Sequence, residues 1–208
     1  MALEIRARTS IDVESTVPVA VRDPALLRHP FLVMCGDARF RFEADERERL
    51  RRWITAGGML FADNSGRGGP STAFDASVRE EFEGLFPGHV FEKIPSQHVI
   101  YRSFYLLDFP AGRAIHRTYL EGLSLDGRLA VLYSHNDVFG ALDREGPDWR
   151  FDVVPGGDSQ RERAIRLAVN VAMYALCLDY KDDQAHTDYL LHERRWRAAP
   201  PRVTPAKP

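Results

Sequence analysis

Several features that would assign the protein to a familiar class are missing from its 208 residues. No apolar run approaches the roughly 20 residues of a membrane-spanning helix, and the start lacks the charged and apolar segments of a signal peptide. Basic and acidic residues nearly balance (28 against 30), so no basic field favours nucleic acid as a partner. We therefore expect a cytoplasmic protein, or a periplasmic or exported one if a signal segment precedes this sequence.

Cysteine is scarce, and the motifs of several enzyme classes are absent. Cys35 and Cys177 are the only two cysteines, which excludes a disulfide framework and a cysteine-rich metal site. We interpret both as small buried hydrophobic residues. There is no nucleophile elbow and no His-Glu-x-x-His helix, and the glycine-rich segment 65–72 lacks the Gly-Lys-Ser/Thr of a Walker A loop. No motif requires a cofactor, so we expect none.

The most informative stretch begins at Gly57, which ends an amphipathic helix and suits the left-handed closing conformation. Residues 59–62 are apolar without alternation, which predicts a short strand covered on both faces. Asp63, Asn64 and Ser65 follow at once. Ligands of open α/β sheets bind beyond the carboxyl ends of the strands, so these residues are site candidates. The alternative is that they only cap a turn.

The pattern along the rest of the chain alternates between apolar strands and amphipathic helices. Further strands are expected at 17–21, 31–35 and 129–133, with a turn region at 122–127 and an irregular connection, a candidate lid, at 140–158. Helices are expected near 2–9, from Asp45 with a capping box to Glu48, from Asp75 along Val78, Phe82, Leu85 and Phe86, and over 160–180 with a capping box from Ser159 to Glu162. The last of these is apolar around most of its girth and should be the most buried.

A second group of polar residues follows the strand predicted at 129–133, and further polar residues follow the strand at 31–35. Carboxyl ends of parallel strands meet at one edge of a sheet, so we expect these groups to share a pocket. His98 and Tyr101, in a polar break before an aromatic segment, suit either a pocket wall or the core. The predicted pocket comprises Gly36, Asp37, Asp63, Asn64, Ser65, His98, Tyr101, Ser134, Asn136 and Asp137.

These side chains are compatible with two kinds of function. His98 or His135, paired with Asp63 or Asp137, could supply the base and orienting carboxylate of a hydrolase, assisted by water or a metal. The same groups could bind a small polar ligand without transforming it. A metal could use Asp37 together with Asp63, His98 and Asp137, but no spacing demands one, and we predict no metal site.

The carboxyl-terminal part of the sequence differs from the rest in composition. We expect one α/β domain over residues 1–181, followed at 182–208 by a helical extension and a disordered tail rich in proline and arginine. His186 and His192 have no obvious ligand partners there. The basic tail is most simply a solvated end, and a contribution to assembly with another protein is the alternative.

Taken in order, the motifs resemble a bacterial family called domain of unknown function 4159. The resemblance covers about residues 3–180. It is carried by Arg8-Thr9-Ser10-Ile11, His29-Pro30-Phe31-Leu32 to Gly36, Gly57-Gly58-Met59-Leu60 to Asp63, Phe74-Asp75, Phe86-Pro87, His98 to Tyr105, Gly127-Arg128 to Tyr133-Ser134, Asn136-Asp137 and Val169-Asn170.

That family looks like a member of the class I glutamine amidotransferase-like superfamily. The resemblance implies a flavodoxin-like three-layer sandwich with a mostly parallel sheet, in which many members begin with an extra strand that this chain would lack. It also implies oxyanion-hole glycines near Gly36 and a nucleophilic cysteine at the position of Asn64. Asn64 cannot form a thiolate, Ser65 would need a positioned base, and Cys35 is on the wrong strand.

We therefore expect an amidotransferase-like domain without the nucleophilic cysteine, acting as a non-catalytic ligand-binding or scaffold module. Its partner would be a small polar ligand or another protein. The alternative is an uncharacterised hydrolase with a His/Asp site at the carboxyl ends of the strands. Fold resemblance alone does not decide between them.

Overall fold

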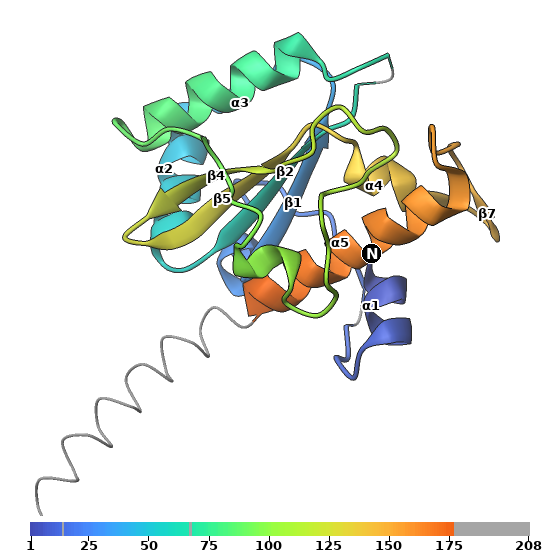
Figure 1. Cartoon of the computed structure of the whole chain (residues 1–208). Helices are drawn as coiled ribbons and strands as arrows, with labels where there is room; N and C mark the ends of the chain where they lie inside the picture. The colour runs from blue at the N-terminus through green and yellow to red at the C-terminus, as the bar shows by residue number, and fades with distance from the viewer. Residues whose placement is uncertain (14, 67, 177–208) are drawn as a thin grey trace, which may run out of the picture. The chain divides into compact units, whose positions relative to one another are not determined.

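A five-stranded mixed sheet forms the centre of the computed structural model, which describes residues 1–13, 15–66 and 68–176. The strand order is β1-β2-β5-β4-β3 (Figure 1). The strands are β1 (Phe31–Gly36), β2 (Met59–Asn64), β3 (Glu92–Lys93), β4 (Glu121–Leu125) and β5 (Arg128–Ser134). Cys177, His186, His192 and the predicted tail at 182–208 lie outside the described residues.

The expected α/β class is confirmed, but the sheet is mixed and not mostly parallel. Strands β1, β2 and β5 run parallel, whereas β4 is antiparallel to β5 and β3 is antiparallel to β4. The reversal comes from the tight turn at Asp126 and Gly127, both of which have positive φ (50° and 79°). The region 122–127, which the sequence predicted as a turn, contains most of β4. The prediction missed this strand because its glycine and serine obscured the strand pattern.

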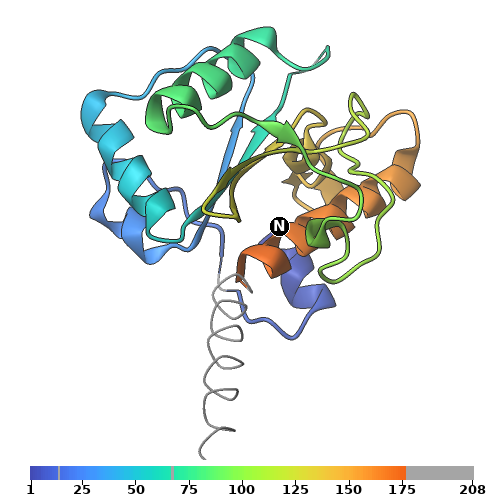
Figure 2. The same cartoon turned by 60° about the vertical axis from the view of Figure 1, so that its left-hand side comes forward.

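Helices cover both faces of the sheet (Figure 2). On one face lie α2 (Ala44–Thr55) and α3 (Thr72–Leu85), and on the other lie α1 (Ala2–Arg8) and α5 (Gly157–Leu176). The shorter elements are η1 (Pro24–Arg28), η2 (Val99–Tyr101), α4 (Val138–Ala141) and the hairpin β6 (Arg144–Glu145) with β7 (Asp148–Trp149). That hairpin lies within the connection predicted to be irregular at 140–158.

The buried faces of the helices follow the apolar spacing of the sequence. Leu50, Trp53 and Ile54 of α2 are buried, as predicted. The stripe from Val78 to Phe86 along α3 is buried too. Helix α5 has more buried residues than any other described helix, which confirms that prediction. Strand β2 is buried at every residue, as its unbroken apolar run indicated.

The helix starts differ from the predicted ones because other nearby residues cap them. In α2 the backbone N–H of Glu43 donates to the Glu46 carboxylate (2.9 Å), so the capping box lies two residues before Asp45 and Glu48. Ser71, and not Asp75, caps α3 by accepting from the N–H of Phe74 (3.2 Å).

Helix α5 likewise begins at Gly157, ahead of the box predicted from Ser159 to Glu162. Glu162 instead pairs with Arg8 of α1 through two bonds of 2.7 and 2.8 Å.

The amino-terminal segment contains one confirmed and one wrong prediction. The helix near residues 2–9 is α1, whose Ile5 packs against Val169 and Ala172 of α5. No described residue pairs with 17–21 as a strand; instead Val19 and Val21 pack, partly buried, against the core under α2 and α3. Short apolar runs satisfy burial as readily in an irregular segment as in a strand.

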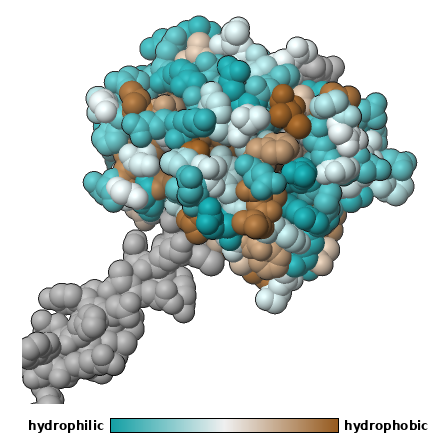
Figure 3. Space-filling view, in the orientation of Figure 1, coloured by the Kyte–Doolittle hydropathy of each residue, from teal (hydrophilic) through white to brown (hydrophobic). Residues whose placement is uncertain are grey.

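None of the described helices is both long and apolar enough to cross a membrane. The face of the molecule in Figure 3 is mostly hydrophilic and carries separate apolar patches. Isolated exposed apolar residues, such as Leu106 at 81 % exposure, are ordinary on protein surfaces.

Gly58 offers a sharp test of the packing between α2 and β2. A Cβ there would lie 2.3 Å from the Trp53 ring, whose indole N–H donates to the His29 carbonyl (2.7 Å). Gly58→Ala should lower the free energy of unfolding by about 1–3 kcal/mol through overpacking. Gly84→Ala, in α3 with no atom within 4 Å of its Cβ, is the matched control and should be neutral or slightly stabilising. Urea unfolding measures both; equal midpoints would contradict the prediction.

Candidate functional site

The register of the three parallel strands places their polar ends side by side. Cys35 of β1 pairs with Asp63 of β2, and Asp63 pairs with Ser134 of β5. In-register neighbours on parallel strands point to the same face of the sheet. The two polar groups that the sequence separates by about seventy positions, 63–65 and 134–137, therefore meet at one edge.

A cavity of about 570 Å³ lies at this edge; we call it the carboxyl-edge pocket. Four of the predicted site residues line it: Gly36, Asp37, Ser65 and Asp137. Its other lining residues come from β1, from the segment after Asp137 and from four further parts of the chain. They are Met1, Thr16, Val33, Cys35, Arg113, Phe139, Gly140, Leu142, Asp143 and Phe151.

The centre of the pocket's charge is an ion pair between Arg113 and Asp137. The Arg113 Nε donates to Asp137 Oδ2, and its Nη2 donates to the Gly66 carbonyl (3.2 Å). Asp137 has a left-handed backbone (φ 53°), and its Oδ1 accepts from the N–H of Gly140 (3.0 Å) at the start of α4. The Arg113 guanidinium also lies over the Phe151 ring, 5.5 Å from its centre.

Gly140 is required by this arrangement. A Cβ at that position would lie 2.3 Å from Asp137 Oδ2, the oxygen that Arg113 binds. A side chain would therefore displace the carboxylate from its partner. Sequence reasoning missed Arg113, Gly140 and Phe151, because each lies in a connection without a motif, and only the fold brings them to Asp137.

Asp63 is completely buried beneath the pocket. Its Oδ2 accepts from the N–H of Phe139 (2.9 Å), while no described residue hydrogen-bonds to its Oδ1. Burial, together with the nearby charge of Asp137, raises the pKa of Asp63 to about 8, although the Phe139 amide acts in the opposite direction. Asp63 is therefore mostly a neutral carboxylic acid at pH 7, and it anchors α4 from below.

Asn64 closes the glycine-rich loop instead of facing the pocket. Its Oδ1 accepts from the N–H groups of Ser71 (2.7 Å) and Gly66 (3.3 Å). Its Nδ2 donates to the Ser71 carbonyl (2.9 Å) and to the Tyr133 hydroxyl (3.2 Å). The side-chain amide is thus fully engaged in holding the two ends of the loop together.

Asn136 does the same for the loop at 110–117. Its Oδ1 accepts from the N–H groups of His116 (2.8 Å) and Arg117 (2.9 Å), and its Nδ2 donates to the carbonyls of Pro110 (3.1 Å) and Arg117 (2.7 Å). Ser134 supports Asn136 by accepting from its backbone N–H (3.1 Å). These buried side chains place the loop that brings Arg113 to the pocket.

The predicted residues His98 and Tyr101 lie away from the pocket: His98 caps η2 and Tyr101 is its last residue. His98 Nδ1 accepts from the N–H of Ile100 (3.2 Å), and its ring lies 5.6 Å from that of Tyr174. The Tyr101 hydroxyl accepts from the N–H of Leu120 (2.9 Å). Neither residue lines the pocket.

His135 is also separate from the pocket lining, although it directly follows β5. Its Nε2 lies 2.9 Å from Glu121 Oε2, and its ring centre lies 4.5 Å from that of Tyr133, with the two rings tilted by 54°. Glu121 in turn pairs with Arg79 of α3 (2.8 Å). His135 is therefore hydrogen-bonded to the Glu121–Arg79 ion pair on the α3 side of the sheet.

Cys35 is exposed, so its interpretation as a buried hydrophobic residue is wrong. Its side chain opens into the pocket because β1 is the edge strand of the sheet. The atoms around the sulfur still desolvate it, and this raises the pKa of the Cys35 thiol, with further contributions from Asp63 and Asp137. Cys35 is therefore a protonated thiol at neutral pH, the opposite of an activated nucleophile.

Metal-ligating side chains are not grouped at this edge. Within residues 1–13, 15–66 and 68–176, no three His, Cys, Asp or Glu side chains are arranged to hold an ion. Asp37 faces the pocket, Asp63 is buried beneath it and His98 caps η2. What the pocket offers a ligand is the carboxylate of Asp37, Asp143 in its ion pair with Arg150 (3.3 Å), the Arg113–Asp137 pair, hydroxyls and two aromatic rings.

The protein is thus a mixed-sheet α/β domain with a polar pocket at the carboxyl ends of its parallel strands. A family model described as "Domain of unknown function (DUF4159)" matches residues 1–176. The chain belongs to this family, as its motifs indicated. A search of curated proteins gave no match.

The buried carboxyl group predicts a distinctive pH dependence. Because the folded state retains the Asp63 proton up to about pH 8 and the unfolded chain releases it near 3.8, folding becomes less favourable as pH rises between these values. Asp63→Asn keeps an acceptor for the Phe139 N–H and removes the ionisation. Relative to the variant, wild type should lose roughly 1.4 kcal/mol of unfolding free energy per pH unit in this window. Urea unfolding measures the unfolding free energy of both proteins across this pH range. If the two free energies change with pH in parallel, the assignment is refuted.

Proposed function

We propose that this domain is a non-catalytic ligand-binding module that holds a small polar ligand in the carboxyl-edge pocket. The observation that carries the proposal is the composition of that pocket. Asp37, Ser65, Asp143 and the Arg113–Asp137 pair offer acceptors and donors around a space of about 570 Å³, a size typical of small-molecule sites. Asp143 pairs with Arg150 (3.3 Å), whereas Asp37 has no hydrogen-bond or ion-pair partner among the described residues, which favours a ligand that carries an amine or several hydroxyl groups.

A relationship to class I glutamine amidotransferases, with their flavodoxin-like sandwich, forms part of this proposal. It is supported by the three parallel strands, by helices on both faces and by Gly36 at the pocket. At the position aligned with the nucleophile stands Asn64, whose side-chain amide is buried and engaged in four hydrogen bonds. Such a residue holds a loop and does not attack a substrate.

The hydrolase alternative has less support. It needs a histidine within hydrogen-bonding reach of the reacting groups. His98 caps η2 and His135 is bound to Glu121, and neither lines the pocket. Ser65 therefore has no histidine base beside it among the described lining residues, and the protonated Cys35 thiol is a poor nucleophile.

A thermal-shift screen tests the proposal, using amines, amino acids, sugars and nucleotides on wild type, Asp37→Asn and the control Glu92→Gln. Asp37 and Glu92 are both exposed acids, but only Asp37 lines the pocket. A ligand at 100 times its dissociation constant adds about 2.7 kcal/mol, or several degrees in Tm. We expect a shift in wild type and in Glu92→Gln that falls by at least about half in Asp37→Asn, since charge-assisted hydrogen bonds are the stronger ones.

Two results would count against the proposal. An equal shift in all three proteins would place the ligand elsewhere. If NMR shows that wild type converts a bound compound to product and that Ser65→Ala does not, the protein is a catalyst and the hydrolase hypothesis is supported.

A further inference from the structure

The outer edge of β1 carries unpaired backbone groups. Among the described strands β1 pairs only with β2, and the carbonyls of Pro30 and Gly36 accept from residues at the two ends of β2. In a parallel ladder the N–H and C=O of one residue point to the same side, and residues alternate. Phe31, Val33 and Cys35 therefore direct both groups away from β2. No described residue hydrogen-bonds to them.

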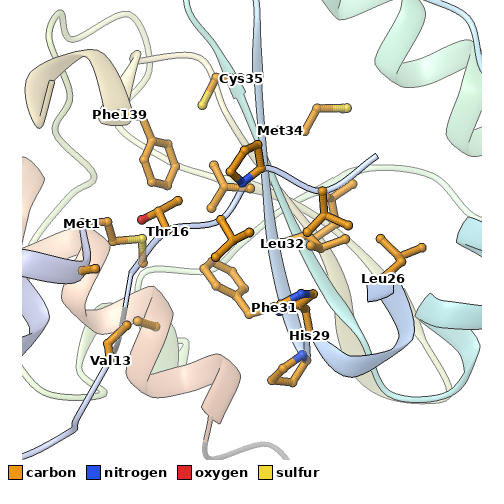
Figure 4. A pocket seen from close by; sticks show the side chains of 18 of the residues that line it. Met1, Val13, Thr16, Leu26, His29, Phe31, Leu32, Met34, Cys35 and Phe139 are labelled. Atoms are coloured by element: carbon orange, nitrogen blue, oxygen red, sulfur yellow. The ribbon is translucent and has the colours of Figure 1, made fainter. Parts of the chain in front are cut away.

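An apolar cavity of about 720 Å³, here called the edge groove, runs along this edge (Figure 4). It extends over both faces of the strand. Leu32 and Met34 line it on the side of the α2 and α3 core, while Val33, Phe139 and Ala172 line it on the other. Residues 15–19 also border it.

Open space on both faces of one edge strand fits a particular occupant. An extended peptide pairs with the free N–H and C=O groups and directs alternate side chains to the two faces, as added strands do in other proteins. A hydrocarbon chain would fill the space but leave these backbone groups unpaired. A second copy of the protein paired at β1 would place its own residues 15–19 against the residues 15–19 that already border the groove.

The charges around the groove specify the occupant further. Among the described residues, no Asp, Glu, Lys or Arg lines it. Just past the carboxyl end of β1 stands the exposed Asp37, which has no hydrogen-bond or ion-pair partner among the described residues. We propose that the edge groove binds an extended apolar segment of a partner protein as an added strand on β1, with a Lys or Arg of that segment beside Asp37.

A synthetic peptide tests this directly. The probe is fluorescein-labelled Lys-Val-Ile-Val-Leu-Val-Lys, with binding measured by fluorescence anisotropy and amide exchange measured by NMR on the full chain. On saturation the amides of Phe31, Val33 and Cys35 should exchange at least about tenfold more slowly, because they gain hydrogen-bond partners. The amides of Leu32 and Met34, already bonded to β2, should change little.

Matched controls separate strand pairing from simple apolar contact. The same peptide N-methylated at alternate residues keeps its side chains but loses donors, and should bind at least roughly tenfold more weakly. Val33→Asp should abolish binding, whereas Val90→Asp, at an exposed apolar residue outside the groove, should not. If Val33→Asp fails to fold, Cys35→Lys at the exposed position serves instead. A peptide with Glu at both ends should bind poorly to wild type and better to Asp37→Lys.

The proposal is overturned by any of four results. The unmodified peptide does not bind; the N-methylated peptide binds equally; dodecylamine displaces the peptide while the amides of β1 stay unprotected; or sedimentation shows a dimer that the peptide dissociates. The third result would assign the groove to hydrocarbon chains, and the fourth to a second copy. None depends on the small-ligand screen, because strand pairing is measured by the exchange of the β1 amides and by the N-methylated peptide, neither of which reports binding of a small ligand in the pocket.

Discussion

The parallel pairing of β2 with β1 on one side and β5 on the other is the constraint on which the rest of the structure depends. It requires a strand that is apolar on both faces, and it ends all three strands at one edge. Each backbone group buried there must find a partner. The polar residues that follow the strands largely serve this need: Asn136 makes four hydrogen bonds to the loop at 110–117, and Asn64 makes three to the glycine-rich loop and one to the Tyr133 hydroxyl.

Those loops in turn create the pocket. Asn136 positions the segment that brings Arg113 to Asp137, and Asp63 anchors α4 through the Phe139 amide. The pocket wall therefore rests on Asn136 and Asp63, which do not line the pocket, while Asp37, Ser65 and the Arg113–Asp137 pair do. A neutral Asp63 belongs to the scaffold, because a charged carboxylate without a counter-ion would be costly at full burial.

The sequence predicted those elements whose buried residues form an apolar pattern within a single short segment. Strands β1, β2 and β5 and the buried faces of α2, α3 and α5 all appear where their apolar patterns indicated. Helix starts were less predictable, since several capping residues compete near each one and tertiary contacts select among them, as for Ser71 over Asp75. The segment at 17–21 packs against the core without a strand partner, and β4 was hidden by Gly122 and Ser124.

For the site, the sequence by itself determined which polar residues end the central strands, because an apolar run followed by polar residues marks the carboxyl end of a buried strand wherever the strand lies. Only the tertiary structure decided what each of them does. It directed Asp37, Ser65 and Asp137 to the pocket, buried Asp63 beneath it, and separated His98 and His135 from it. It also left β1 as an open edge beside an apolar groove. Side-chain direction and strand order depend on contacts between distant segments, and no local pattern carries that information.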